Sequence, residues 1–325
     1  MDIRQVQEYL SPQWGEVQAL MKKALASDIP LLNFTNDNLL SNSGKMLRPM
    51  LTLLMARACG DCNQDSVRSA ASVELLHNAT LFHDDVADAS DTRRGKPTVN
   101  ALLGSRASVL LGDFWLVRAV ETILSMSRNT NEVVRLFSKT LSDLAEGEML
   151  QLQKASKADT TEEDYLRIIY SKTASLFEVA CVTAAMSAGA SEEVIEAARS
   201  YAVNLGLAFQ MKDDIMDYHP KGSIGKPVGI DILEQKITLP LLEALLQAGE
   251  QEQEEIRQIV MTVSDHPERA SEVISFVKRY NGVVLAGEKL DTYVRKAVDA
   301  LEPLPQSEAR DLLVQLARFT AEREM

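Results

Sequence analysis

Residues 66 to 88 read SVRSAASVELLHNATLFHDDVAD, and this stretch decides the fold. Its apolar residues recur at three- and four-residue steps, which is the period of an α-helix rather than that of a strand. One side of the expected helix carries Val67, Ala70, Ala71, Leu75, Ala79, Phe82 and Val86. Acidic residues follow at its end, before the loop DTRRGKP at 91 to 97. We therefore expect a long helix whose final turns carry carboxylates.

The same helical period runs through nearly the whole chain, in which glycine and proline are sparse. We expect one helix from the capping-box-like start at Thr161 towards Gly189, and another from Ser191 to the stop at His219 and Pro220. No repeat, low-complexity tract or linker divides the sequence. These patterns predict an all-α protein in which residues 1–325 form a single domain.

The bulk composition excludes several classes of protein. With 325 residues, 46% of them hydrophobic, the chain can bury a core without disulfides, and its three cysteines form no disulfide framework. We therefore expect a reducing, cytoplasmic location. The formal charge of −13 argues against nucleic-acid binding, which needs a surplus of Lys and Arg. No segment approaches the ~18 uncharged apolar residues of a membrane span, so none is expected.

Two aspartate clusters share one spacing. Asp84 and Asp88 are four residues apart and so lie on nearly the same helix face, with Asp85 about 100° away. The second cluster consists of Asp213, Asp214 and Asp217. Like charges at this spacing destabilise a helix by a few tenths of a kcal/mol, which indicates a compensating cation. Mg²⁺ suits a few hard oxygen ligands and bridges them to substrate phosphates, so the pattern predicts a diphosphate site.

A solvated acidic surface is the alternative interpretation of either cluster alone. Both clusters, however, follow strongly apolar segments, LLHNATLF and LGLAFQM, which favour burial over free solvation. Local positive charge for an anionic ligand is present in GKMLRP at 44 to 49 and in TRRGKP at 92 to 97. Arginine supplies bidentate, charge-assisted donors to phosphate, so these patches fit a diphosphate.

The sequence at this point resembles the trans-isoprenyl diphosphate synthase family, and within it the long-chain polyprenyl diphosphate synthases. The resemblance spans nearly the whole chain and includes GKMLRP (44–49), LLHNATLFHDDVADASDTRRGKPTVN (75–100), GDFW (112–115), EGEMLQL (146–152), KTASLF (172–177), LAFQMKDDIMDY (207–218) and GKPVGIDILEQKITLPLL (225–242). One position departs from the family pattern, because Gln235 stands where the family usually has glycine. The departure concerns the geometry of the glycine-rich loop at 221 to 229, which we interpret as a flap.

The resemblance implies an isoprenoid synthase type I helical bundle around a central apolar cavity, with the two clusters facing each other across its mouth. It implies Mg²⁺ ligation by Asp84, Asp88, Asp213 and Asp217, and catalytic roles for Asp85, Arg93, Lys172 and Asp214 as well. The residues that it assigns to isopentenyl diphosphate are Lys45, Arg48, His77 and Arg94. Those that it assigns to the allylic diphosphate, or to closing over it, are Arg93, Lys172, Thr173, Gln210, Lys226 and Lys236. Individually, Lys45 and Lys236 could also be surface lysines, and His77 a core histidine.

The implied reaction is ionisation, condensation and elimination, and Mg²⁺ and basic side chains stabilise the departing pyrophosphate. Product length depends on the side chains below the first cluster. Thr80 and Ala79 lie about one helical turn (~5.4 Å) before Asp84, and Leu76 about two turns before it. An aromatic residue at that depth stops growth early in the family, whereas Ala79 leaves the cavity open. We therefore expect a long product.

Octaprenyl diphosphate for a quinone side chain, made from farnesyl diphosphate and isopentenyl diphosphate, is the product that we expect. The alternatives are a short-chain farnesyl or geranylgeranyl diphosphate synthase, a terpene cyclase, and a non-catalytic regulatory subunit. The cyclase is disfavoured because such enzymes lack GKMLRP and DTRRGKP. Intact aspartates and arginines disfavour the regulatory subunit. The family also implies a homodimer, with peripheral membrane association through the product at most.

Overall fold

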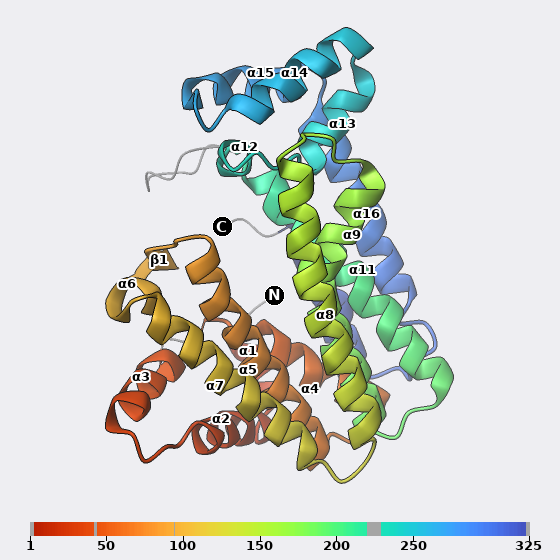
Figure 1. The fold of residues 1–325 in the computed structure, drawn as a ribbon. Coiled ribbons are helices and arrows are strands. Elements are labelled where there is room, and N and C mark those ends of the chain that lie inside the picture. The colour runs from red at the N-terminus through yellow and green to blue at the C-terminus, as the bar shows by residue number, and fades with distance from the viewer. Residues whose placement is uncertain (1–2, 42–43, 94, 220–228, 323–325) are drawn as a thin grey trace. The chain divides into compact units, whose positions relative to one another are not determined.

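The computed structural model describes residues 3–41, 44–93, 95–219 and 229–322 (Figure 1). Almost all regular structure in these ranges is helical, and the two short strands β1 (Thr92–Arg93) and β2 (Lys96–Pro97) form an antiparallel hairpin. The all-α expectation is confirmed. The chain divides into two compact units, and each unit is assembled from separate stretches of sequence.

The first unit comprises Met1–Ser138, Val179–Arg199 and Pro303–Leu313, and the second comprises Lys139–Glu178, Ser200–Glu302 and Val314–Met325. Besides the hairpin, the first unit contains α1 (Ile3–Tyr9), α2 (Gln13–Ala24), α3 (Pro30–Ser41), α4 (Leu47–Cys59), α5 (Gln64–Ala87), α6 (Val99–Leu103) and α7 (Ser105–Leu124). The second contains α9 (Glu162–Ile169), the π-helix η1 (Tyr170–Ala174), α12 (Ile230–Leu233), α13 (Leu239–Gln247), α14 (Glu250–Thr262), the 3₁₀-helix η2 (Pro267–Arg269), α15 (Ala270–Arg279) and α16 (Gly282–Asp299). The helices with residues in both are α8 (Thr130–Ala155), α10 (Ser175–Ser187), α11 (Glu192–Met216) and α17 (Glu308–Glu322).

Helix α5 is the central element of the first unit. It packs against α2, α4 and α7, and Figure 1 shows α5 and α7 running alongside each other. The predicted helix over 66–88 is confirmed, but α5 is buried on more than one side. Ser69 and Ser72 are buried as fully as Leu75 and Leu76, and the Ser72 hydroxyl donates to the Arg68 carbonyl at 2.8 Å. Small side chains that bond back to their own helix let α5 pass through the core without leaving unsatisfied polar atoms.

The start of α5 is set by a capping box at Asn63. Its side-chain oxygen accepts from the backbone nitrogens of Asp65 at 2.9 Å and Ser66 at 3.2 Å, and the Ser66 hydroxyl accepts from the Asn63 nitrogen at 3.2 Å. These bonds satisfy donors that the first helical turn leaves open. The Asn63 amide also donates to the Ser187 carbonyl at the end of α10, at 2.7 Å. The cap therefore fixes two helix ends together.

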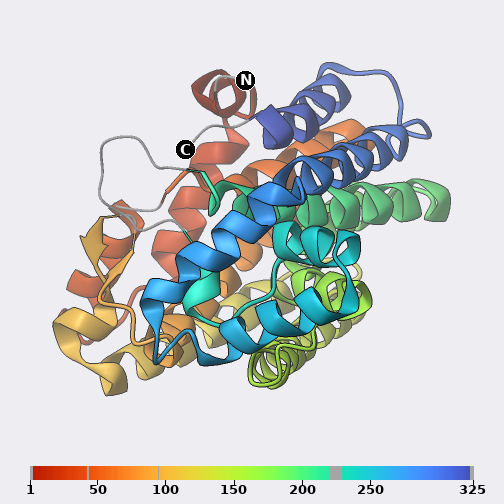
Figure 2. The same cartoon turned by 90° about the horizontal axis from the view of Figure 1, so that it is seen from above.

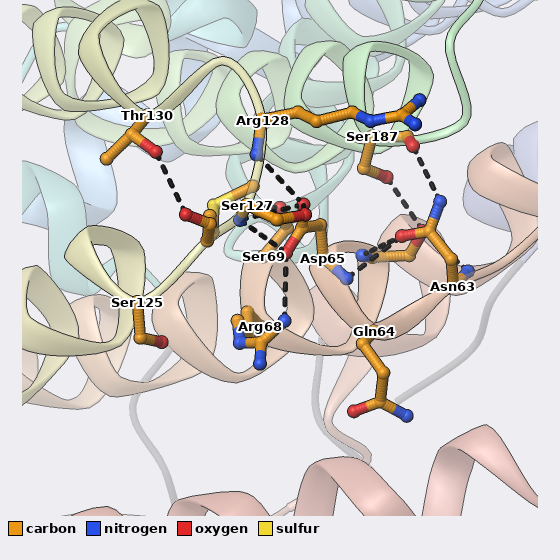
Figure 3. Close-up of polar contacts among 12 residues, drawn as sticks. Asn63, Gln64, Asp65, Arg68, Ser69, Ser125, Ser127, Arg128, Thr130 and Ser187 are labelled. Atoms are coloured by element: carbon orange, nitrogen blue, oxygen red, sulfur yellow. Dashed lines mark hydrogen bonds and ion pairs between the residues drawn. The ribbon is translucent and has the colours of Figure 1, made fainter.

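Asp65, in the first turn of α5, joins the α7–α8 connection to this helix (Figure 3). Its buried carboxylate accepts from the Ser127 hydroxyl at 2.6 Å, from the Ser127 and Arg128 backbone nitrogens at 3.0 and 3.2 Å, and from Arg68 Nη1 at 2.9 Å. Burial by itself would raise the pKa of Asp65, but the bonds from Ser127 and Arg68 outweigh it and lower the pKa. Asp65 is therefore ionised and well supplied with donors.

The second unit is organised around α13, which packs against α15 and α16 (the cyan to blue segments in Figure 2). Lys289 of α16 adds an ionic link, because its ammonium lies 2.7 Å from Glu162 Oε1 and 2.5 Å from Oε1 of the buried Glu243. The expected helix start at Thr161 is confirmed, since the Thr161 hydroxyl accepts from the Asp164 nitrogen at 3.2 Å. The helix that follows changes from α9 through the π-helix η1 to α10 and ends at Ser187.

One helical run, Glu162–Ser187, is long and apolar enough by length and composition to cross a membrane. Of its most apolar window, 89% is buried inside the protein, as in a core helix. Its apolar character therefore serves the protein core.

Replacing Asp65 with asparagine should lower the free energy of unfolding by about 3 kcal/mol, because an amide nitrogen would then face the Ser127 and Arg128 donors. Urea unfolding near pH 7 measures the difference, with the exposed Asp265→Asn variant as the control. Since the folded pKa of Asp65 lies below its unfolded value of about 3.9, the stabilisation is present above that pH. It should disappear as the pH falls through the folded pKa. An unchanged unfolding midpoint would contradict the assigned role.

Candidate active site

The first aspartate cluster lies at the C-terminal end of α5, in the first unit. Asp84 and Asp88 are exposed, while Asp85 is buried with 3% of its surface accessible. This division follows from helix geometry, because positions four residues apart share a face that the intervening position does not. Two carboxylates at this helix end are thus open to a ligand, and the third is turned into the protein.

Asp85 is bonded to the hairpin that follows α5. Its Oδ1 accepts from Arg93 Nε at 2.8 Å, and its backbone carbonyl accepts from the Ser90 nitrogen at 2.9 Å and the Asn100 amide at 3.2 Å. In this ion pair Arg93 is half-buried and Asp85 is buried. A carboxylate on Nε fixes the plane of the guanidinium, so Asp85 orients Arg93.

A second basic group in this unit joins α4 to α5. Arg48 Nη1, in the first turn of α4, lies 3.0 Å from His77 Nε2, and both side chains are half-buried. Lys45 of the same motif is exposed. Arg94, which the sequence assigned to the same ligand, lies outside the described residues. The structure thus brings together two of the four residues predicted to bind isopentenyl diphosphate.

The second aspartate cluster ends α11, in the second unit. Asp213 is half-exposed, whereas Asp214 and Asp217 are buried. Asp214 Oδ2 accepts from the Tyr165 hydroxyl at 2.7 Å and its Oδ1 from the Gln210 amide at 2.9 Å. The Gln210 carbonyl oxygen accepts in turn from the Thr173 hydroxyl at 2.8 Å. A chain of hydrogen bonds therefore connects η1, α11 and α9.

Asp217 holds the start of α12. Its two carboxylate oxygens accept from the backbone nitrogens of Ile230 at 3.2 Å and Asp231 at 3.1 Å, and its carbonyl accepts from the Gly229 nitrogen at 3.0 Å. A carboxylate at a helix N-terminus satisfies open N–H groups and favours the helix dipole. The segment that re-enters the described structure after residue 228 is therefore anchored on the aspartate cluster.

Asp231 is a further carboxylate at this cluster, and we did not predict it from the sequence. Burial, then the charge of Asp231, raises the pKa of Asp214 to about 8; burial, then the charge of Asp217, raises that of Asp231 to about 6. A divalent cation would offset this mutual repulsion, so the donor set fits a hard metal ion. The stretch GIDIL at 229 to 233 has no local spacing that marks Asp231, which becomes a neighbour only through the fold.

No group of three or more His, Cys, Asp or Glu side chains within residues 3–41, 44–93, 95–219 and 229–322 converges to hold a metal by itself. Mg²⁺ is usually bound by one or two carboxylates together with substrate phosphates, and two-carboxylate clusters suit this mode. The donors present therefore fit a metal that arrives with a diphosphate.

Lys172 and Thr173 lie in the π-helix η1, whose wider turn is a form often seen at functional sites. Lys172 forms an ion pair with Glu148 and donates to Gln151 Oε1 at 3.1 Å. Both partners belong to EGEMLQL on α8, a motif quoted in the sequence analysis without a role. Glu148 and Gln151 were not predicted as site residues from the sequence, although the motif EGEMLQL could have indicated them.

Close backbone approach makes room for η1. A Cβ at Gly147 of α8 would lie 2.5 Å from Ser171 Cβ, and a Cβ at Gly206 of α11 would lie 2.5 Å from Ala174 Cα. Only glycine fits at these two positions without a shift of η1. The two glycines therefore let α8 and α11 pack against the turn that carries Lys172.

The residues predicted to set product length lie along α5. Leu76 and Ala79 are fully buried, and the half-buried Thr80 donates its hydroxyl to the His77 carbonyl at 2.8 Å. Phe82, the next buried residue after Ala79 on α5, packs edge to face on Trp115 of α7, with ring centroids 5.3 Å apart. A small side chain, Ala79, thus lies about one turn before Asp84 and an aliphatic one, Leu76, about two turns before it, with the nearest aromatic pair at Phe82.

Lys236 follows the second aspartate cluster in the chain, and its backbone nitrogen donates to the Asp231 carbonyl at 2.8 Å. Lys236 forms an ion pair with Glu234, and Lys226 and residues 220–228 of the expected flap lie outside the described residues. Gln235, which replaces the usual glycine, has a φ of 60°. This left-handed conformation costs a non-glycine residue about 1 kcal/mol, so the local backbone keeps the form that glycine adopts freely.

Comparisons with known proteins found similar sequences and structures. Residues 29–277 match the family model described as polyprenyl synthetase. The chain is 37% identical to octaprenyl diphosphate synthase of Haemophilus influenzae over 99% of this chain and 98% of that protein. It superposes on a decaprenyl diphosphate synthase from Rhodobacter capsulatus with a TM-score of 0.92, at 33% identity and covering 99% of this chain and 100% of that one.

A second structure carries ligands. A polyprenyl synthase from Caulobacter crescentus, complexed with calcium and isoprenyl diphosphate, superposes with a TM-score of 0.89 at 33% identity, covering 99% of this chain and 98% of that one. In that protein a divalent cation and a prenyl diphosphate were bound together.

Replacing Gly206 with alanine should destabilise the protein by about 2 kcal/mol, because the new methyl group would overlap Ala174 in η1. In an open helix the same change is stabilising, so the sign reports the close approach. Thermal unfolding measures the change. Gly287→Ala, inside α16, is the control, since nothing lies within 4 Å of the added carbon. A Gly206→Ala variant as stable as the wild type would show that α11 and η1 are not in close contact.

Proposed function

The chain belongs to the polyprenyl synthetase family, and we propose that it is a Mg²⁺-dependent trans-prenyltransferase that extends an allylic diphosphate with successive isopentenyl diphosphates. The product is a long-chain polyprenyl diphosphate. The observation that carries this proposal is the pair of Asp-Asp-x-x-Asp clusters, each at a helix end, with a buried middle aspartate and a first aspartate that is at least partly accessible. The 37% sequence identity to an octaprenyl diphosphate synthase, over 99% of this chain and 98% of that protein, supports it.

In the proposed reaction Asp84, Asp88, Asp213 and Asp217 hold Mg²⁺, which when bound neutralises the diphosphate as a leaving group. Arg93, Lys172, Thr173, Gln210, Lys226 and Lys236 bind the allylic diphosphate, and Lys45, Arg48, His77 and Arg94 bind isopentenyl diphosphate. Asp85 orients Arg93 through the 2.8 Å bond to its Nε, and Asp214 anchors the second cluster through Tyr165 and Gln210. Buried anchors of this kind preorganise charged groups at low reorganisation cost.

Bond formation needs no dedicated protein base in this scheme. The allylic carbon–oxygen bond breaks, and the double bond of isopentenyl diphosphate attacks the allylic cation to form the new carbon–carbon bond. A proton then leaves to the released pyrophosphate, and a new double bond results. The role of the protein is to exclude water from the cation, because water would otherwise capture it.

We propose farnesyl diphosphate as the primer and octaprenyl diphosphate as the product, used as a quinone side chain. The length is supported by the octaprenyl and decaprenyl diphosphate synthases that the chain resembles, and by small or aliphatic side chains at Ala79 and Leu76. The enzyme works in the cytoplasm and contacts membranes at most through its lipid product.

We also propose that residues 1–325 act as one synthase domain and that two copies associate. The family match includes parts of both units, which supports a single functional domain. Leu110, Val117 and Leu124 of α7 are more than half exposed and recur every seven residues, so they share one helix face. A second copy of the chain would bury this apolar face, which favours a homodimer.

Incubation of the purified protein with Mg²⁺, farnesyl diphosphate and labelled isopentenyl diphosphate tests the function. Chromatography of the dephosphorylated products should show a ladder that ends at a long all-trans prenol, and Asp84→Asn should lower the rate by at least about a hundredfold. A wild-type protein that incorporates no label would instead favour the regulatory subunit.

Replacing Ala79 with tyrosine should shorten the product to about farnesyl or geranylgeranyl length, because a bulky ring would occupy the core one turn below Asp84. The same chromatography measures the shift. The exposed Ala26→Tyr variant is the control for the added ring. An unchanged product distribution in the Ala79→Tyr variant would contradict the role assigned to this position.

A further inference from the structure

Tyr165 is a buried hydroxyl donor that the proposed reaction does not use directly. It lies on α9 with 3% of its surface accessible, and its hydroxyl donates to Asp214 Oδ2 at 2.7 Å. A buried tyrosine hydroxyl needs a partner, and a carboxylate is the strongest acceptor that a protein offers. The partner here is the middle aspartate of the second cluster.

The helix that carries Tyr165 is held firmly at its start. The Thr161 nitrogen donates to Asp164 Oδ2 at 3.0 Å, the Asp164 nitrogen donates back to the Thr161 hydroxyl, and Lys154 of α8 lies 2.9 Å from the same carboxylate oxygen. This capping box fixes the first turn of α9, and Tyr165 is the residue directly after Asp164. The hydroxyl is therefore presented from a rigid support.

The Asp214 carboxylate is held on both of its oxygens. Tyr165 donates to one, and the Gln210 amide donates to the other at 2.9 Å, while Thr173 orients Gln210 at 2.8 Å. Burial and the charge of Asp214 raise the pKa of Tyr165 well above its usual value, so the hydroxyl remains a donor near neutral pH. With both donors in place, the carboxylate cannot rotate away from α9.

The turn of α11 that carries the cluster depends on these contacts. Asp213 and Asp214 are adjacent, and the Asp217 nitrogen donates to the Asp213 carbonyl at 3.2 Å to close the turn. The Asp217 carboxylate is held by the backbone nitrogens of Ile230 and Asp231 at the start of α12. Without the Tyr165 hydroxyl, Asp214 would remain buried beside the negative charge of Asp231 with one donor fewer.

We propose that Tyr165 is a positioning residue for the second aspartate cluster: it holds Asp214 through its hydroxyl and so places Asp213 and Asp217 for a divalent cation. The inference rests on the proposed function, because it concerns the metal site of that reaction. Tyr165 contacts neither substrate nor metal in this scheme and acts only through Asp214.

Tyr165→Phe removes the hydroxyl and leaves the ring volume, and Tyr280→Phe is the matched control. Tyr280 also donates to a carboxylate, Glu252 Oε2 at 2.5 Å, but it joins α15 to α14 away from the cluster. Mn²⁺ binding in the presence of inorganic pyrophosphate is measured by electron paramagnetic resonance. Asp84→Asn and Asp88→Asn are present in every sample, so that the second cluster dominates the signal.

We expect Tyr165→Phe to weaken Mn²⁺ binding about tenfold, as loss of one hydrogen bond to a charged group does, and Tyr280→Phe to leave it unchanged. In the protein with an intact first cluster, the Mg²⁺ concentration for half-maximal turnover should rise by a similar factor. Wild-type Mn²⁺ affinity in Tyr165→Phe would overturn the inference. A wild-type protein without synthase activity would instead overturn the proposed function, while the Mn²⁺ titration still tests Tyr165.

A second comparison separates positioning from loss of folding. In an Asp214→Asn background the carboxylate that Tyr165 holds is gone, so adding Tyr165→Phe should change Mn²⁺ binding less than about twofold. Thermal unfolding confirms that both proteins are folded. A further tenfold loss in this background would show that Tyr165 acts independently of Asp214 and would overturn the inference.

Discussion

A carboxylate that leaves water must find hydrogen-bond donors, and this constraint shapes both units of the protein. Asp65 satisfies it through Ser127, Arg128 and Arg68, and thereby joins the α7–α8 connection to the start of α5. Asp85 satisfies it through Arg93, and Asp214 through Tyr165 and Gln210. In each case at least one donor comes from another segment of the chain, so burial of one charge fixes the relative positions of two or three segments.

The same constraint gives the three aspartates of each cluster different environments. In both, the middle residue is buried and bonded to the protein, whereas the first is exposed in one cluster (Asp84) and half-buried in the other (Asp213). Asp217 is the exception among the outer residues, because it is buried and caps α12. The metal-binding carboxylates that we propose thus differ in environment: Asp84 and Asp88 are exposed, whereas Asp217 is buried and bonded to α12, and Asp213 adjoins the hydrogen-bonded Asp214. A connected network holds its members more rigidly than exposed side chains hold theirs.

Small residues contribute as much to the site as charged ones. Gly147 and Gly206 let α8 and α11 approach η1, and Gly112 leaves room for the His83 ring, whose Nε2 would lie 2.3 Å from an added Cβ. Ala79 is a small, buried residue about one turn before Asp84, where a larger side chain would have to displace its neighbours. Motifs such as GDFW and EGEMLQL therefore combine a glycine for close approach with polar neighbours, and Glu148 and Gln151 next to Gly147 bond to Lys172.

The sequence by itself determined the helical period, the cap at Thr161, the approximate bounds of α5 and α11, and the two aspartate clusters, because each depends on residues only a few positions apart. It also led, through its motifs, to the family. Only the tertiary structure decided that Asp85 and Asp214 turn inward, that Glu148 and Gln151 bond to Lys172, and that Asp231 lies beside the second cluster. It also decided that α5 is buried on more than one side and that a π-helix interrupts the helix after Thr161. These features depend on atoms brought together from distant parts of the chain, where burial and hydrogen-bond satisfaction, rather than local spacing, select the arrangement.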